Sequence, residues 1–179
     1  MALGSLVNCA LCGMVYKPRY IRTKEIVGTA LITLLVLSIS QFMKFTLLNK
    51  IKAFRGCDNW GCGSFGASRG EHKHKGIDFA MAENDVVLAP FPCEIIRHGY
   101  AYSDLSYKLI EIRGLRSYSD YTAKIMYIKD FAPVGTIINE GQKIALADNI
   151  AARYSTTMTN HVHFELYLRG KLIDPTNLF

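Results

Sequence analysis

The segment His74-Lys75-Gly76-Ile77-Asp78 places an imidazole and a carboxylate four positions apart. Both groups are common zinc ligands, and the glycine between them lets the backbone curl so that both side chains can point at one ion. Such a pair also occurs in proteins that bind no metal. The segment therefore predicts part of a metal site only if a further ligand is available.

A second segment, HVHFELY, runs from His161 to Tyr167. Side chains alternate between the two faces of a strand, so His161 and His163 share one face while Val162 and Phe164 point to a core on the other. The two imidazoles then lie roughly 6 to 7 Å apart. One can bind a metal while the other stands over a metal-bound water, although an HxH pair is also often structural.

These residues require strands to position them, and the chain after Gly56 has a β pattern. Five runs rich in Val, Ile and Tyr are separated by Gly, Pro, Asn and Asp: VVLAPFPCEII, YKLIEIRG, YTAKIMYI, TIINEGQKIALA and HVHFELYLRG. No long helix is predicted after residue 56. The sequence therefore predicts an all-β or β-dominated domain with a mostly antiparallel sheet.

Cysteines indicate the compartment. Cys57 and Cys62 form a close pair in the Gly-rich stretch RGCDNWGCGSFG, which predicts a disulfide and an oxidising environment. Cys93 has no obvious partner and is expected to be a small buried hydrophobe. Cys9 and Cys12 have CxxC spacing, but no second pair completes a zinc site, and their role stays open.

Residues 26–43, IVGTALITLLVLSISQFM, carry no charge and as a helix would span about 27 Å. They predict a transmembrane signal anchor between a basic tail, 1–25, and a linker, 44–55. Basic residues flank both ends, so the cysteine pair decides the orientation and places the domain, residues 56–179, outside or in a lumen. The alternative is a cleaved signal peptide, with Ser38-Ile39-Ser40 as cleavage site, especially if synthesis begins at Met14.

The length of 179 residues fits one domain with some remainder, and the net charge is +6. Residues 1–55 contain eight Lys/Arg and one Glu, whereas residues 56–179 contain thirteen Lys/Arg and fourteen Asp/Glu. The positive charge thus belongs to the segment around the apolar run, as expected at a membrane flank. This distribution argues against a nucleic-acid partner.

Taken in order, several motifs resemble the lysostaphin-type zinc endopeptidases, which cut glycyl or similar peptide bonds in bacterial cell walls. They are HKGIDFA, VLAP, GTIINEGQKIA, HVHFE and DPT, within residues 57–179. Inside that superfamily, CDNWGCG, APF and KIMYIK are similar to the chemotaxin-2 family of secreted animal proteins. The resemblance implies a lysostaphin-like fold and a disulfide between Cys57 and Cys62.

The resemblance also implies Zn²⁺ bound by His74, Asp78 and His163, with His161 as general base on a water at the fourth position. Active endopeptidases carry a further His two residues after a strand Tyr. Here the Tyr is Tyr127, but Lys129 replaces the His. Strand alternation predicts that Tyr127 and Lys129 share a face, and the resemblance places that face over the zinc. The alternative is that Lys129 is solvated and points away.

The sequence thus favours a membrane-tethered or secreted zinc-binding protein that signals or interacts outside the cell. Its expected partner is an extracellular receptor or other protein, and peptidase activity is not expected because the further His is missing. The alternative is a zinc metalloendopeptidase that cleaves glycyl or peptidoglycan peptide bonds. Hydrolysis of a glycine-rich peptide would separate the two.

Overall fold

The computed structural model describes Phe45 and residues 54–179, all within one compact unit, Lys44–Phe179. The predicted tail 1–25, the membrane segment 26–43 and most of the linker 44–55 lie outside the described residues. Where the chain is described, it forms no helix with the length and hydrophobicity needed to span a membrane.

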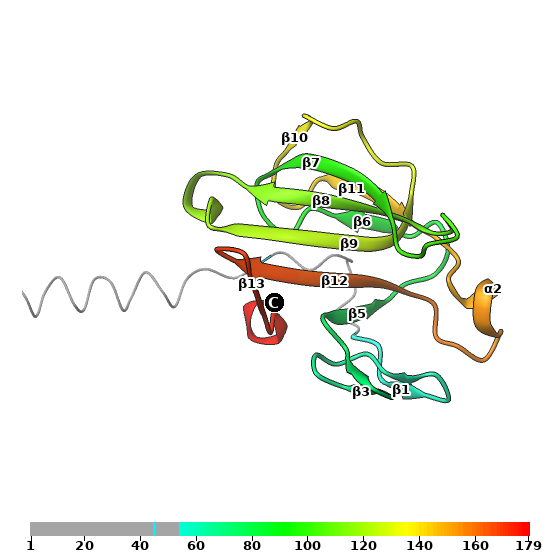
Figure 1. The fold of residues 1–179 in the computed structure, drawn as a ribbon. Coiled ribbons are helices and arrows are strands. Elements are labelled where there is room, and N and C mark those ends of the chain that lie inside the picture. Colours follow the sequence, from blue (N-terminus) through cyan, green and yellow to red (C-terminus); the bar gives the residue numbers. More distant parts are fainter. Residues whose placement is uncertain (1–44, 46–53) are drawn as a thin grey trace, which may run out of the picture. The chain divides into compact units, whose positions relative to one another are not determined.

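A nine-stranded sheet forms the body of the domain (Figure 1). Its main path runs β10-β7-β8-β9-β11-β6, and β12 pairs with β9, β5 and β13. Every pairing in it is antiparallel. The strands are β5 (Ile77–Ala80), β6 (Val86–Leu88), β7 (Cys93–Tyr100), β8 (Lys108–Gly114), β9 (Tyr121–Lys129), β10 (Ile137–Ile138), β11 (Lys143–Ala147), β12 (His161–Leu168) and β13 (Lys171–Ile173).

The predicted β-dominated, mostly antiparallel architecture is confirmed. All five predicted runs contain strands, and two of the runs each split into a pair at an internal turn. The described residues contain a single α-helix, α2 (Ala151–Tyr154), and two 3₁₀ turns, Arg116–Tyr118 and Thr176–Leu178.

Alternating apolar residues on the strands build the core. On β12, Val162, Phe164 and Leu166 are fully buried, as the alternation of the sequence predicts. Cys93 on β7 is also fully buried and unpaired, and burial raises the pKa of its thiol to about 12. It therefore behaves as the small hydrophobe that the sequence indicates.

Phe45 belongs to the same core although it lies in the predicted linker. Its ring packs against those of Phe91, Tyr121 and Phe179, with centroid separations of 4.9, 5.4 and 5.6 Å. Its backbone N–H donates to the carbonyl of Leu178. The packing of the domain thus begins before Gly56.

Two small hairpins lie beyond β5 (Figure 1). The first joins β1 (Cys57–Asp58) to β2 (Gly61–Cys62) and contains the predicted disulfide between Cys57 and Cys62. The second joins β3 (Ser68–Arg69) to β4 (His72–Lys73). The Asp78 N–H donates to the carbonyl of Gly63, and this bond ties the first hairpin to β5.

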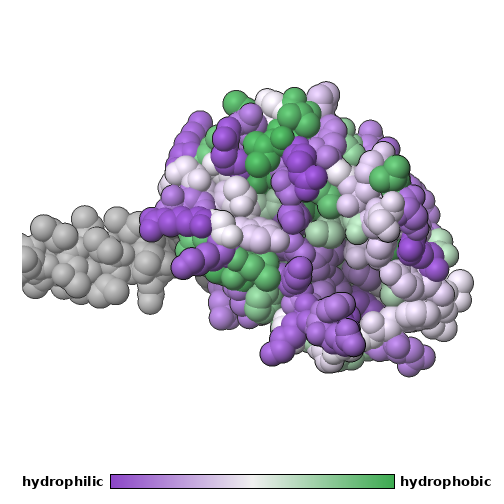
Figure 2. Space-filling model, viewed as in Figure 1, coloured by the Kyte–Doolittle hydropathy of each residue, from purple (hydrophilic) through white to green (hydrophobic). Residues whose placement is uncertain are grey.

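The surface of the domain is mixed. In Figure 2, hydrophilic residues dominate the visible face, and hydrophobic ones form separate groups between them. The predicted metal ligands and their polar neighbours are buried, each with 8% or less of its surface exposed: His74, Asp78, His161, His163 and Glu165.

Candidate metal centre

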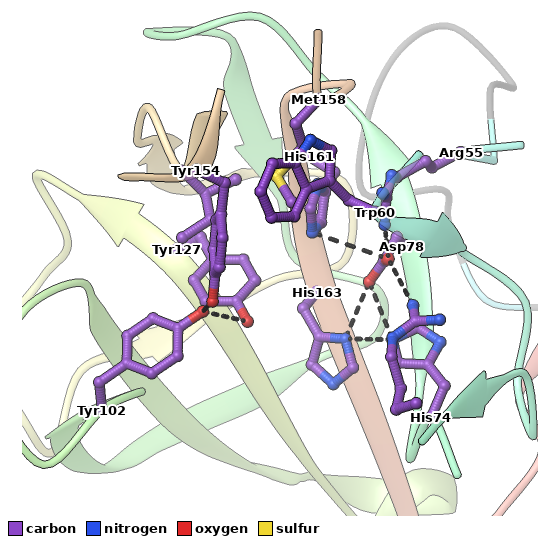
Figure 3. A pocket seen from close by; sticks show the side chains of 12 residues that line it. Arg55, Trp60, His74, Asp78, Tyr102, Tyr127, Tyr154, Met158, His161 and His163 are labelled. Carbon is purple, nitrogen blue, oxygen red and sulfur yellow. Dashed lines mark hydrogen bonds and ion pairs between the residues drawn. The ribbon is translucent and has the colours of Figure 1, made fainter. Parts of the chain in front are cut away.

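The structure brings the three predicted ligands together. His74 Nε2 lies 2.9 Å from His163 Nδ1 and 3.1 Å from Asp78 Oδ1, and the last two atoms lie 2.9 Å apart. The three donor atoms form a nearly equilateral triangle (Figure 3). A tetrahedral zinc site with bonds of about 2.1 Å has edges of about 3.4 Å, so a slight expansion of the triangle gives one face of such a site.

Strand pairing positions two of these residues. Asp78 on β5 lies directly opposite His163 on β12, and both side chains point to the same side of the sheet. Gly76 lets the chain pass close to β12, since a Cβ there would lie 2.1 Å from the carbonyl oxygen of Phe164. His74 can therefore extend back over the pair from just before β5.

Each donor residue is oriented by a second contact. The Nδ1 of His74 lies 2.8 Å from the carbonyl oxygen of Ser64, which can only accept a hydrogen bond. Nδ1 therefore carries the ring proton, and Nε2 keeps a lone pair that can bind a metal. The Nε2 of His163 lies 3.6 Å from Glu165 Oε1. Outer contacts of this kind fix tautomers and orientation in metal sites.

The site is electrostatically suited to a cation. Burial alone would raise the pKa of Asp78, but His163 and His74 hold that pKa below its usual range, so the carboxylate is ionised. Burial would likewise lower the pKa of His163, yet Asp78 and Glu165 outweigh it and raise that pKa. A positive charge between these carboxylates is therefore favoured, and this donor set fits zinc.

His161 lies beside the triangle and outside it. Its Nδ1 donates to the carbonyl of Thr159 at 2.8 Å, and its Nε2 lies 3.7 Å from Asp78 Oδ2. Burial is the main cause that lowers the pKa of His161. The imidazole is thus neutral at pH 7, with a lone pair on the nitrogen nearer Asp78, as a general base requires.

Lys129 departs from the sequence-based expectation. Its Nζ pairs with Glu83 Oε1 at 2.6 Å, a hydrogen bond that raises the pKa of the ammonium further, and Lys129 does not line the cavity at the site. A β-bulge precedes it: Lys108 pairs with Ile128 and Leu109 with Met126, so Tyr127 is an extra residue. The ion pair with Glu83 holds the Lys129 ammonium, and only Tyr127 of the two residues lines the cavity.

The donor triangle opens into a cavity of about 260 Å³. Arg55 is one of its lining residues, is 5% exposed, and donates to Asp78 Oδ2 at 3.0 Å. Burial raises the pKa of Tyr127, which keeps its hydroxyl protonated. The lining also includes residues that the sequence did not single out: Arg55, Trp60, Arg69, Tyr102, Ile150, Tyr154 and Met158.

Nothing in the spacing of these residues marked them in advance. Arg55 stood among the basic residues of the predicted linker, and Trp60 within the cysteine loop. Tyr102 lies in the loop after β7 and Tyr154 in α2, and only the tertiary fold brings their hydroxyls within 2.8 Å of each other.

Comparison with known proteins supports the family and the fold. The sequence profile of peptidase family M23 matches residues 72–175, which include all three donor residues. Leukocyte cell-derived chemotaxin-2 of Mus musculus is 32% identical over 112 residues, 62% of this chain and 71% of that protein. Myeloid protein 1 of Gallus gallus is 33% identical over 139 residues, 72% of this chain and 38% of that protein.

The solution structure of lysostaphin shares the fold. Its TM-score is 0.55 at 19% identity, with 73% of this chain and 51% of that chain covered.

Proposed function

The chain belongs to peptidase family M23, and on that premise we propose that it is an extracellular zinc-binding protein of the chemotaxin-2 kind, which holds a ligand at its metal centre without hydrolysing it. The observation that carries the proposal is the convergence of His74 Nε2, Asp78 Oδ1 and His163 Nδ1, with distances of 2.9 to 3.1 Å.

These three side chains would hold zinc through two nitrogens and one oxygen, a set that leaves a position for a water or ligand. Bound zinc supplies a Lewis acid and a local positive charge. Ser64 and Glu165 orient the two imidazoles, and Arg55 holds the second oxygen of Asp78. The site is preorganised for the ion because its ligands are fixed by strand pairing and these contacts.

Slow or absent turnover is supported by the composition of the cavity wall. The imidazoles that line it, within the described part of the chain, are those of His74, His161 and His163. The further His expected of an active endopeptidase is replaced by Lys129, which is paired with Glu83 at 2.6 Å. Losing one positioned transition-state donor typically costs about 2.7 to 4 kcal/mol, a hundredfold to a thousandfold in rate.

An extracellular or lumenal location is supported by the disulfide between Cys57 and Cys62, since such bonds persist in oxidising compartments. Tethering by residues 26–43, or secretion after cleavage near Ser40, is part of the proposal and rests on the sequence alone. So does an extracellular receptor or other protein as partner.

A zinc endopeptidase is the second candidate, and the geometry of His161 favours it. The Nδ1 proton of His161 is fixed by the Thr159 carbonyl, so its Nε2 is free to take a proton from a water in the cavity. In this reading His161 is the general base, and the substrate is a glycyl or peptidoglycan peptide.

Peptide hydrolysis decides between the candidates. The purified full chain, supplied with zinc, is incubated with pentaglycine, and the release of new amino groups is followed over time. We expect no more hydrolysis than with His161→Ala, which retains the three donor residues. Clear hydrolysis by the wild type that is lost in His161→Ala would replace the binding-protein proposal with the endopeptidase.

A further inference from the structure

The cavity wall that faces the donor triangle is built from tyrosine hydroxyls. Tyr102 Oη lies 3.2 Å from Tyr127 Oη and 2.8 Å from Tyr154 Oη. Figure 3 shows these three side chains on one side of the cavity, with Asp78 and Arg55 on the other. A ligand in the cavity therefore lies between the metal donors and the phenols.

Counting protons shows which hydroxyl is available. A hydroxyl has one proton to donate, and the geometry makes Tyr102 the donor to Tyr127. Tyr154 must then donate to Tyr102. The proton of Tyr127 is left, and it has no acceptor among the described residues, although Tyr127 lines the cavity.

The backbone conformation also directs the side chain of Tyr127 into the cavity. It is the extra residue of a bulge in β9, and its φ of 65° lies in the left-handed region, which a residue with a large side chain rarely adopts. Bulges re-aim side chains, and strained residues concentrate at binding sites. Without the bulge, alternation would turn Tyr127 to the core face shared with Ile125.

The charges around the cavity indicate the charge of the ligand that it would bind. Arg55 lies 2.6 Å from Asp58 and 3.0 Å from Asp78, and Arg69 lies 3.8 Å from Asp78, so the fixed charges around the cavity cancel. A divalent cation at the donor triangle then leaves an excess positive charge that an anion can offset.

We propose that Tyr127 donates its phenolic proton to the carboxylate of a ligand held at the metal centre, and that the site therefore binds carboxylic acids with a small apolar side chain. This inference rests on the proposed function, because carboxylate binding here needs a metal ion at the donor triangle. The cavity volume of about 260 Å³ suits a ligand of one or two amino-acid residues, and Trp60 and Met158 offer apolar contacts.

The chain contains its own reporter for this binding. Trp60 is its one tryptophan, and it lines the cavity with its ring 5.3 Å from that of Tyr154. A ligand that enters the cavity should change its fluorescence.

The test titrates the zinc-loaded full chain with N-acetyl-alanine and with N-acetyl-alaninamide, which lacks only the carboxylate. We expect saturable quenching or enhancement by the acid and at least tenfold weaker binding of the amide. N-acetyl-trialanine is the third probe: tighter binding than N-acetyl-alanine identifies a peptide C-terminus as the source of the carboxylate, and equal binding identifies a small free acid. Both results support the carboxylate site.

Tyr127→Phe keeps the ring and removes the proton, and should weaken binding of the acid about tenfold or more, the effect of losing one hydrogen bond to a charged group. Tyr100→Phe is the matched control, because Tyr100 is 47% exposed and outside the cavity, and should bind as the wild type does. Zinc content is measured in every sample.

The outcomes separate this inference from the function beneath it. A wild-type chain that takes up no zinc overturns the proposed function and this inference with it. A zinc-loaded chain that binds acid and amide equally, or a zinc-loaded Tyr127→Phe that binds the acid as well as the wild type, overturns this inference alone.

Discussion

Gly76→Ala should separate the two strands that form the metal centre. A Cβ at position 76 would lie 2.1 Å from the carbonyl oxygen of Phe164, 2.8 Å from its carbonyl carbon and 2.9 Å from His163 Cε1. That carbonyl belongs to the backbone of β12, which pairs with β5 on one side and β9 on the other. It cannot rotate away as a side chain would, so the chain around Gly76 must move by about 1 Å to restore normal contact.

Overpacking of this kind costs about 1 to 3 kcal/mol, and more where backbone is the obstacle. We expect a loss of about 3 kcal/mol, which for a domain of this size lowers Tm by about 10 °C. The same movement displaces His163 from Asp78, so zinc uptake should fall too. Thermal unfolding and zinc content of the purified chain measure both effects.

Gly56→Ala is the matched control. A Cβ at Gly56 meets no atom within 4 Å, so this variant should stay within about 0.5 kcal/mol of the wild type. If Gly76→Ala has the same Tm and the same zinc content as Gly56→Ala, the close approach of the chain at Gly76 to β12 is refuted.

Three further predictions concern stability. Chelation with EDTA should lower Tm by about 13 °C, since a ligand at a thousandfold excess over its Kd contributes about 4 kcal/mol; an unchanged melt would argue against a folded-state metal site. Burial alone would raise the pKa of Asp58, but two backbone N–H groups and Arg55 lower it to about 2. The contribution of ionised Asp58 to the free energy of unfolding should therefore be complete above the unfolded pKa of about 4 and disappear as the pH falls to about 2. Urea unfolding of Asp58→Asn should not show this decrease with falling pH. Replacing Cys57 and Cys62 together by Ser should cost about 2 kcal/mol in urea unfolding, because their loop is short; no change would show that the bond does not form.

The local alternation of apolar and polar residues was sufficient to predict the strands and the two faces of β12. The alternation in HVHFELYL predicted a core face, and Val162, Phe164 and Leu166 are fully buried. It also predicted that His161 and His163 share the other face, where both border the cavity. Period-2 patterns are reliable here because a strand with one face in a core has one register that buries its apolar side chains.

Patterns of that kind could not reveal what depends on a single backbone irregularity or on distant segments. Tyr127 lines the cavity as the extra residue of a bulge, whereas Lys129 pairs with Glu83 and does not line it, so the expectation that both face the zinc was wrong for Lys129. Trp60 and Tyr154 are far apart in the chain, yet their rings lie 5.3 Å apart at the cavity. No period links such residues, and only strand pairing and loop closure bring them together.

The central claim is that three side chains form one metal site, and zinc stoichiometry tests it most directly. The full chain and four alanine variants are equilibrated with zinc, freed of excess metal and analysed for bound zinc per chain. We predict one zinc in the wild type and in His161→Ala, whose imidazole lies outside the donor triangle, and little in His74→Ala, Asp78→Ala and His163→Ala. A wild type without zinc, or a folded His163→Ala with its full content, would contradict the account.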